Sequence, residues 1–188
     1  QQAHGRNAVA VYQGNPSVHN YGLMTHSNYF LGLLKTRNRF SATSVDQLPQ
    51  HLVSHLMYGH GLLLPIPDID HTGFMLILGG NPLASNGSIM TVPDVEKRLK
   101  ALRARGGRLV VVDPRRSETA AMADRHLFIR PGADAALLCG LLNTLFEEGL
   151  ARGSHLPVNG LQQVREAIAP FSAEAVSAQC GIAAADIR

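Results

Sequence analysis

Residues 74–82 read FMLILGGNP, and residues 108–116 read RLVVVDPRR. Each segment is a short, continuous apolar run that ends in turn-forming or charged residues, which is the pattern of a parallel strand buried on both faces. Between the two runs, residues 92–104 carry apolar side chains at helical spacing, with Pro93 in the first turn and Gly106-Gly107 beyond the last. This strand–helix–strand order predicts a βαβ unit with parallel strands.

The same alternation extends in both directions along the chain. Further strands are predicted at residues 8–12, 39–43 and 126–129, a loop at 59–73, and helices at 21–34, 51–57, from 117, 134–148, 162–168, 173–178 and from 183. We therefore predict an α/β fold, a three-layer Rossmann-like domain with a mainly parallel sheet and helices on both faces. This domain is expected over residues 1–150, and a short helical tail over residues 151–188 is expected to lead into the next domain of a longer protein.

Composition excludes several classes of protein. The chain of 188 residues is 45% hydrophobic and 16% charged, which is typical of a folded globular protein and not of a disordered one. No apolar run is long enough to span a membrane. The net charge of +3 comes from scattered arginines, which argues against nucleic acid as a partner and suits a small anionic ligand. No signal peptide is recognisable, the expected location is cytoplasmic, and both chain ends look cut.

Residues able to bind a ligand follow the predicted strands. Ligands of open parallel sheets bind beyond the carboxyl ends of the strands, so these positions are the candidate site. The usual Gly-x-Gly-x-x-Gly of a NAD-binding site is absent, which leaves a nucleotide site of another kind. The candidate ligand-binding residues are Gly14 and Asn15, then Gly80, Asn81, Pro82 and Ser85, then Asp113 and Arg115, and finally Gly132 and Asp134.

These residue types suit the parts of a nucleotide. Glycine lets the backbone approach a phosphate, and side chains such as Asn81 and Ser85 offer hydrogen-bond donors. A carboxylate such as Asp113 can accept two hydrogen bonds from a ribose diol, and Asp134 can accept a pair of N–H groups from a guanine edge. Arg115 and Arg116 can neutralise pyrophosphate. Each motif alone has a structural alternative, namely a turn, a helix N-cap or a partner of the helix dipole. Their joint occurrence favours nucleotide binding.

Three of these segments resemble a known family. Residues 76–85, 106–120 and 130–137 are closely similar to the molybdopterin oxidoreductases, which include formate dehydrogenases, nitrate reductases and dimethyl sulfoxide reductase. The strong similarity covers about residues 74–148, and it rests on the order and spacing of three motifs. A looser similarity covers Tyr12–Pro16, Ser44–Gln47 and Cys180–Arg188.

The resemblance implies a cofactor and a set of partners. It implies a molybdenum or tungsten ion held by two molybdopterin guanine dinucleotides, with one nucleotide end bound by this domain. Asn81 and Ser85 would lie by the phosphates, and Asp113, Arg115 and Asp134 would face the ribose and guanine. The resemblance also implies formate dehydrogenase-like activity, a 4Fe-4S cluster in an upstream segment, a small-molecule substrate, an electron-transfer subunit, and the remaining domains of the same chain as partners. Without those domains, we expect weak or no cofactor binding and no activity.

The metal ligand is where this sequence departs from the family. Many members use cysteine, selenocysteine, serine or aspartate in the loop after the second strand, but no cysteine precedes Cys139 here. Ser44, Asp46, His51 and no protein ligand at all remain alternatives, and the metal ligand is left unassigned. His51 is the one candidate for a catalytic role, with a surface histidine as the alternative.

Two other functions stay open at this stage. One is a non-catalytic relative that keeps the fold without the metal, such as the large subunit of a respiratory complex. The other is the nucleotide-binding middle domain of a thiamine-dependent enzyme, which shares the sheet architecture. The metal content of the full-length protein would separate these functions from the first.

Overall fold

The computed structural model describes residues 1–14, 17, 19–151 and 158–188, without the side chains of Ser44 and Ile89. The chain folds into two compact units. Unit 1 contains residues 1–67 and 88–90, and unit 2 contains residues 68–87 and 91–188. The division between these two units does not fall at residue 150. The boundary predicted at residue 150 concerns the domains of a longer protein, and it stays a prediction.

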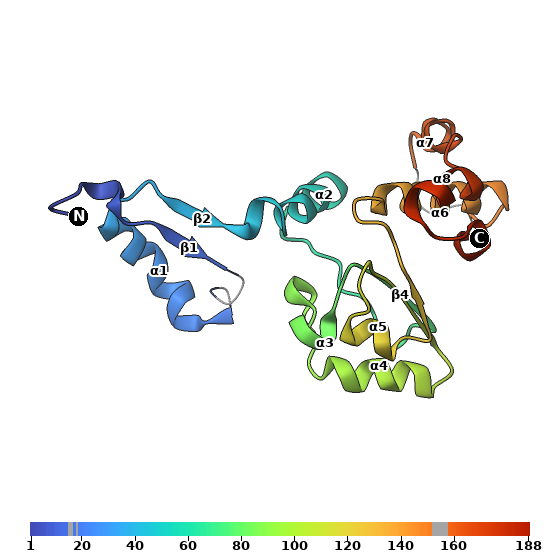
Figure 1. Ribbon diagram of the computed structural model, residues 1–188, viewed down its shortest axis with the longest axis horizontal. Helices are drawn as coiled ribbons and strands as arrows, with labels where there is room; N and C mark the ends of the chain where they lie inside the picture. The colour runs from blue at the N-terminus through green and yellow to red at the C-terminus, as the bar shows by residue number, and fades with distance from the viewer. Residues whose placement is uncertain (15–16, 18, 152–157) are drawn as a thin grey trace. The chain divides into compact units, whose positions relative to one another are not determined.

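Unit 1 is built around one βαβ element (Figure 1). Strands β1 (Val11–Gln13) and β2 (Arg39–Ser41) pair in parallel, and helix α1 (Tyr21–Leu34) connects them. Asn20 caps α1, because its side chain accepts a hydrogen bond from the Leu23 N–H at 3.0 Å. The helix predicted at 21–34 is therefore confirmed.

The other elements of unit 1 differ in their bounds from the prediction. The first strand begins later than residue 8, because Arg6–Ala8 form the 3₁₀ turn η1. The second strand stops at Ser41, which caps the 3₁₀ turn η3 (Ala42–Ser44). Helix α2 runs over Leu48–Tyr58 and so extends past the predicted 51–57 at both ends, and η4 covers Ser88–Met90. Residues 59–73 contain no helix or strand, as predicted.

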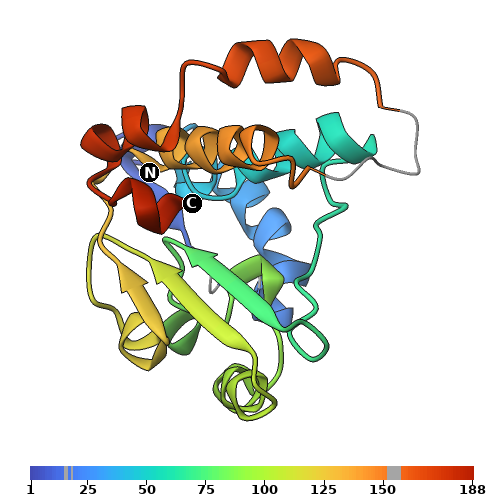
Figure 2. The same ribbon diagram turned by 90° about the vertical axis from the view of Figure 1, so that its right-hand side faces the viewer.

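Unit 2 contains a parallel sheet of order β3-β4-β5 (Figure 2). Its strands are β3 (Phe74–Leu78), β4 (Arg108–Val112) and β5 (Arg125–Leu127). Helix α3 (Pro82–Ser85) and then α4 (Val95–Ala104) lie between β3 and β4, and α5 (Glu118–Met122) lies between β4 and β5. The predicted α/β class with parallel strands and flanking helices is confirmed, although the described strands form two sheets and not one.

Helix α4 begins at Val95, so the prediction that placed Pro93 in its first turn was wrong. Asp94, which follows Pro93, adopts a left-handed conformation with φ of 55° and is the N-cap residue, so the helical backbone starts only after it. The end of the helix was predicted correctly. Gly106 has φ of 86°, its N–H donates to Arg103 O at 3.0 Å, and the N–H of Gly107 donates to Leu102 O at 2.9 Å.

Two apolar clusters lie on the two faces of this sheet. One joins Leu109 and Val111 of β4 to helices α4 and α5, through Leu99, Leu102 and Ala120. The other joins Val112 to helices α6 (Asp134–Glu147), α8 (Ala173–Cys180) and α9 (Ala184–Ile187). Figure 2 shows α4 and α6 on opposite sides of the strands. Helix α7 (Leu161–Ile168) contacts α6.

Strand β3 is not buried on both faces, which corrects the prediction from its continuous apolar run. Phe74, Leu76 and Leu78 are 55%, 39% and 37% exposed. They share the sheet face of Val110 and Val112, and the helices of unit 2 cover that face only in part. The continuous apolar run in the sequence therefore predicted the strand correctly, but it did not predict which face of the strand is covered.

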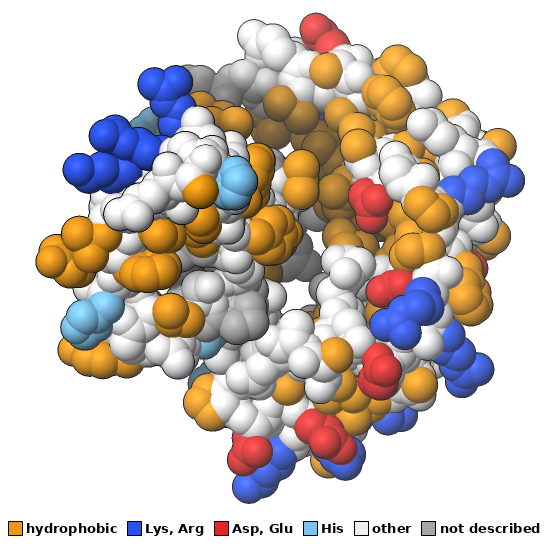
Figure 3. All heavy atoms as spheres, turned by 60° about the vertical axis from the view of Figure 1, so that its left-hand side comes forward, with side chains coloured by type: hydrophobic (Ala, Val, Ile, Leu, Met, Phe, Trp, Pro, Cys, Tyr) orange, Lys and Arg blue, Asp and Glu red, His pale blue; other side chains and the backbone are white. Residues whose placement is uncertain are grey.

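Unit 1 buries little apolar surface. Among its described side chains, Leu31 is the one large apolar side chain that is buried, whereas many on α1 and α2 are exposed. Figure 3 shows hydrophobic side chains spread widely over the visible surface. No helix in the part of the chain described above has the length and hydrophobicity needed to cross a membrane.

Close packing of α6 against α8 depends on the absence of a side chain at Gly140. A Cβ added at Gly140 would lie 2.5 Å from Val176 Cγ2. We expect Gly140→Ala to lower the free energy of unfolding by about 1–3 kcal/mol, measured by urea denaturation. Gly32→Ala in α1 is the control, because its Cβ would meet nothing within 4 Å. This control should raise stability by about 0.5–1 kcal/mol, and an equal gain from Gly140→Ala would contradict the packing argument.

The carboxylate of Asp124 makes folding sensitive to acid. Its pKa lies below the ordinary value, mainly because it accepts the Leu109 N–H at 2.8 Å and also because Arg103 Nε donates to it at 2.7 Å. A depressed pKa stabilises the fold above the pKa of the unfolded chain, about 4, and this contribution is lost as pH falls through the folded pKa. We expect Asp124→Asn to reduce stability at pH 7 and to flatten its decline below about pH 4 in pH-dependent denaturation. An unchanged acid decline would count against this role.

Candidate functional site

The carboxyl ends of β3, β4 and β5 meet at one edge of the sheet. The N–H of Gly79 donates to Val112 O at 2.9 Å, and the N–H of Asp113 donates to Leu127 O at 3.1 Å, so the ladder continues just past the strand ends. Gly79 has φ of 60°, a conformation that favours glycine, and a Cβ built on it would meet nothing within 4 Å. The loops that follow β3 and β4 therefore leave the sheet side by side.

Asn81 ties the loop after β3 to the start of α5. Its Oδ1 accepts hydrogen bonds from Thr119 Oγ1 at 2.7 Å and from Thr119 N at 3.2 Å. Its Nδ2 donates to Glu118 Oε2 at 2.6 Å. Because both polar atoms of the amide have protein partners, Asn81 holds the loop in place in this structure. Ser85 then donates to Asn81 O at 3.2 Å, and Pro82 opens α3.

Asp113 is the first residue beyond β4 and is 8% exposed. Its Oδ1 accepts the Arg115 N–H at 2.7 Å, and its carbonyl oxygen accepts a hydrogen bond from His126 Nε2 at 3.0 Å. Within the described residues, Oδ2 has no hydrogen-bond donor. A buried carboxylate with one oxygen unused is suited to accept hydrogen bonds from hydroxyl groups of a ligand.

Arg115 and Glu118 add charge to the same edge. Arg115 Nη2 lies 3.7 Å from Glu118 Oε2, and both side chains are exposed. The pKa of Glu118 is lowered, first by its own backbone N–H, then by the Asn81 amide and by Arg115. The carboxylate is therefore ionised near neutral pH, and the guanidinium remains open to an anion on its exposed side.

Gly80, Gly132 and Asp134 complete the set predicted from the sequence in unit 2. Gly80 is half-buried, with Ile77 Cγ2 3.1 Å from an added Cβ, and Gly132 has φ of 81°. Asp134 is the exposed first residue of α6. In the described part of the chain, no hydrogen bond or ion pair joins Asp134 to Asp113 or Asn81. The structure thus brings Asn81, Asp113 and Arg115 into one network and leaves Asp134 outside it.

The candidate metal ligands belong to unit 1. Ser44 is the last residue of η3, and its side chain is not among the described ones. Asp46 is exposed. Asn15 and Pro16, from the loop after β1, lie outside the described residues. His51 lies on α2, and its Nδ1 donates to Gly61 O at 2.7 Å, which ties the helix to the following loop. Among the residues that the structure describes, no group of at least three His, Cys, Asp or Glu side chains could hold a metal. A catalytic role for His51 stays a prediction.

Glu118 and His126 are the residues that sequence reasoning missed. Glu118 reads only as a residue in the first turn of a short helix, and its contact with Asn81 spans 37 positions. His126 reads only as part of a short strand. No local pattern marks either residue, because each acquires its role from a contact with another segment.

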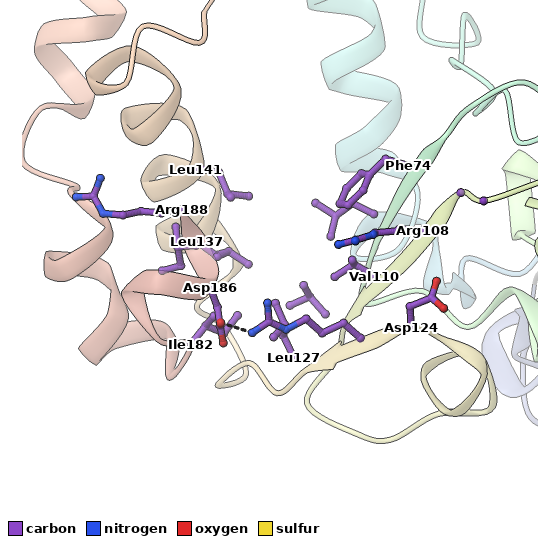
Figure 4. A pocket seen from close by; sticks show the side chains of 16 residues that line it. Phe74, Arg108, Val110, Asp124, Leu127, Leu137, Leu141, Ile182, Asp186 and Arg188 are labelled. Atoms are coloured by element: carbon purple, nitrogen blue, oxygen red, sulfur yellow. Dashed lines mark hydrogen bonds and ion pairs between the residues drawn. The ribbon is translucent and has the colours of Figure 1, made fainter. Parts of the chain in front are cut away.

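A cavity of about 700 Å³ lies elsewhere in unit 2. Figure 4 shows Phe74 and Val110 on its sheet side and Leu137 and Leu141 on its helix side. Arg125 and Asp186, which form an ion pair, also line the cavity. Its lining is largely apolar and lies along the incompletely covered face of the sheet. Phosphate and ribose need polar partners, so the strand-end network and not this cavity is the candidate nucleotide site.

Comparisons with known proteins agree on one family. A family model described as molybdopterin oxidoreductase matches residues 1–173. The assimilatory nitrate reductase catalytic subunit of Bacillus subtilis (strain 168) is 28% identical over 100% of this chain and 26% of its own length. Formate dehydrogenase H of Escherichia coli (strain K12) is 26% identical over 94% of this chain and 24% of its own length.

A solved structure gives the same result. Acetylene hydratase from Pelobacter acetylenicus matches with a TM-score of 0.68 and 26% identity, over 100% of this chain and 25% of that chain. The chain therefore spans about a quarter of the length of the relatives that it matches.

The hydrogen bonds between Asn81 and Thr119 can be measured by a double-mutant cycle. We expect Asn81→Ala and Thr119→Val to show a coupling free energy of about 1 kcal/mol in denaturation, because the two side chains share a bond of 2.7 Å. Asn81→Ala combined with Thr144→Val is the control, since the Thr144 hydroxyl donates within α6 to Gly140 O. That second pair should be additive, and additivity in the first pair would show that the bond does not form.

Proposed function

This chain belongs to the molybdopterin oxidoreductase family, and we propose that its unit 2 binds one nucleotide end of a bis-molybdopterin guanine dinucleotide cofactor. The full-length protein is then a formate dehydrogenase-like oxidoreductase that carries molybdenum or tungsten. When bound, the metal supplies the redox chemistry of such an enzyme, and the residues of this chain bind and orient the cofactor.

The observation that carries the proposal is the network at the carboxyl edge of the sheet. Asp113 is buried there, keeps Oδ2 without a donor in the described part of the chain, and lies beside the exposed cation Arg115. A vicinal diol and a pyrophosphate are the groups that such a carboxylate and guanidinium bind. The donor set therefore fits the ribose and phosphate of a nucleotide.

The other residues take the roles that their positions allow. Glycines at 79 and 80 leave the backbone free to approach a phosphate, and Asn81 and Ser85 hold this loop. Pro82 starts the short helix that follows. Gly132 lets the chain turn into α6, where the exposed carboxylate of Asp134 is free to accept two N–H groups from guanine.

The parts of the proposal that concern the whole protein follow from the family. The partners are the remaining domains of the same chain, a small-molecule substrate and an electron-transfer subunit, with a 4Fe-4S cluster upstream and a cytoplasmic location. The exposed apolar side chains of α1 and α2 and the open face of β3 support contact with further domains. By itself this chain would bind the cofactor weakly and catalyse nothing, since it spans about a quarter of its relatives.

One observation favours a second candidate function. Residues 1–138 contain no cysteine, so no thiolate from this segment can bind the metal. A relative that keeps the fold without the metal and without catalysis would lack such a ligand. The thiamine-dependent alternative has no support now that the family model matches residues 1–173.

The test measures the metal and nucleotide content of the full-length protein, purified from its native host. We expect about one molybdenum or tungsten per chain, and guanosine monophosphate released by acid denaturation, followed by assays with formate, nitrate and acetylene. Iron without either metal would support the non-catalytic relative.

Asp113→Asn tests the site itself. It keeps the size of the side chain but removes its charge, so we expect the bound nucleotide per chain to fall about tenfold or more after gel filtration. Glu166→Gln is the matched control, because Glu166 lies on α7 and its carboxylate accepts a hydrogen bond from Gln162 of the same helix. Equal nucleotide content in the two variants would contradict a role for Asp113.

A further inference from the structure

His126 belongs to the candidate site although its sequence context does not mark it. It lies on β5, opposite Val111 of β4 in the parallel register, and its ring is half-buried. Nε2 lies 3.0 Å from the carbonyl oxygen of Asp113. Because a carbonyl oxygen only accepts hydrogen bonds, Nε2 must carry the hydrogen.

We propose that His126 is a positioning residue that holds Asp113 for the nucleotide, an inference that rests on the function proposed above. Asp113 is held at three points. Its N–H donates to Leu127 O, its Oδ1 accepts the Arg115 N–H, and its carbonyl oxygen accepts the hydrogen of His126 Nε2. Two of the three partners, His126 and Leu127, are neighbours on β5, so this strand fixes the backbone of Asp113.

The carbonyl that His126 binds sets the direction of the ligand loop. This carbonyl belongs to the peptide bond between Asp113 and Pro114, and proline restricts its own φ to a narrow range. With the peptide plane held by His126, the turn that leads to Arg115 has little freedom, and the Arg115 N–H can reach Oδ1 of Asp113 at 2.7 Å. One imidazole therefore orients both the carboxylate and the loop that carries the cation.

The main alternative is a histidine that only fills space. The side chain of His126 is half-buried and not fully enclosed in a core. Its ring stacks at a tilt on Phe128, with centroids 4.2 Å apart, and Phe128 is 59% exposed. The ring pair therefore lies near the surface, where loss of volume costs less than in a core. The hydrogen bond to Asp113 is the contact that the geometry assigns to the imidazole.

The experiment uses three substitutions of His126 in the full-length protein. His126→Gln places an amide N–H about as far from the backbone as Nε2, His126→Asn places one only as far as Nδ1, and His126→Leu has no donor. The readouts are the melting temperature and the rate at which bound cofactor is lost during dialysis, measured as the guanosine monophosphate that acid hydrolysis releases from the retained protein. We expect the loss to be about tenfold faster in His126→Asn and His126→Leu, and close to the unsubstituted rate in His126→Gln.

Two comparison variants separate the possible failures. Gly140→Ala destabilises unit 2 at the α6–α8 contact, away from the site, and reports what lower stability alone does to the rate. If Gly140→Ala has the same melting temperature as His126→Leu and loses nucleotide equally fast, His126 only stabilises the fold and the proposal is overturned. An unchanged rate of loss in all His126 variants would also overturn it. Asp113→Asn tests the proposed function. If Asp113→Asn and the His126 variants all lose nucleotide at the unsubstituted rate, the proposed nucleotide site is wrong. If Asp113→Asn loses nucleotide faster and the His126 variants do not, only the role of His126 is rejected.

Discussion

The parallel ladder between β3, β4 and β5 is the constraint on which the rest of unit 2 depends. Its register pairs Leu78 with Val112 and Val112 with Leu127, so all three strands end at the same level. Parallel strands need long connections, and these place α4 and α5 on one face of the sheet. Every residue assigned to the network at the strand ends takes its place from this common edge.

Side-chain hydrogen bonds then hold the loops that the ladder brings together. Asn81 connects the loop after β3 to α5, and Asp113 connects the end of β4 to its own following turn and to β5. Such loops carry backbone polar groups that cannot pair within a strand or helix, and these bonds satisfy them. These bonds order the edge, and Asp113 Oδ2 has no hydrogen-bond donor there among the described residues. In the function proposed above, this oxygen and the exposed side of Arg115 bind the nucleotide.

The two faces of the sheet in unit 2 are covered unequally. Purely parallel sheets are normally covered on both faces, yet Phe74 and Leu76 stay exposed beside a cavity of about 700 Å³. Unit 1 likewise buries little apolar surface among its described residues. Both observations fit a chain that spans about a quarter of the length of its relatives.

The sequence by itself determined the α/β class, the strands at 74–78 and 108–112, the helix at 21–34, the glycine stop at 106–107 and the position of Asp113 at a strand end. These are local properties, because apolar runs, caps and turn residues act over a few neighbouring positions. Only the tertiary structure decided that Asn81 bonds Thr119, 38 positions away, that His126 holds Asp113 from the next strand, and that one face of β3 is exposed. Those outcomes depend on which segments meet, and a contact between distant segments leaves no periodic or compositional pattern in either one.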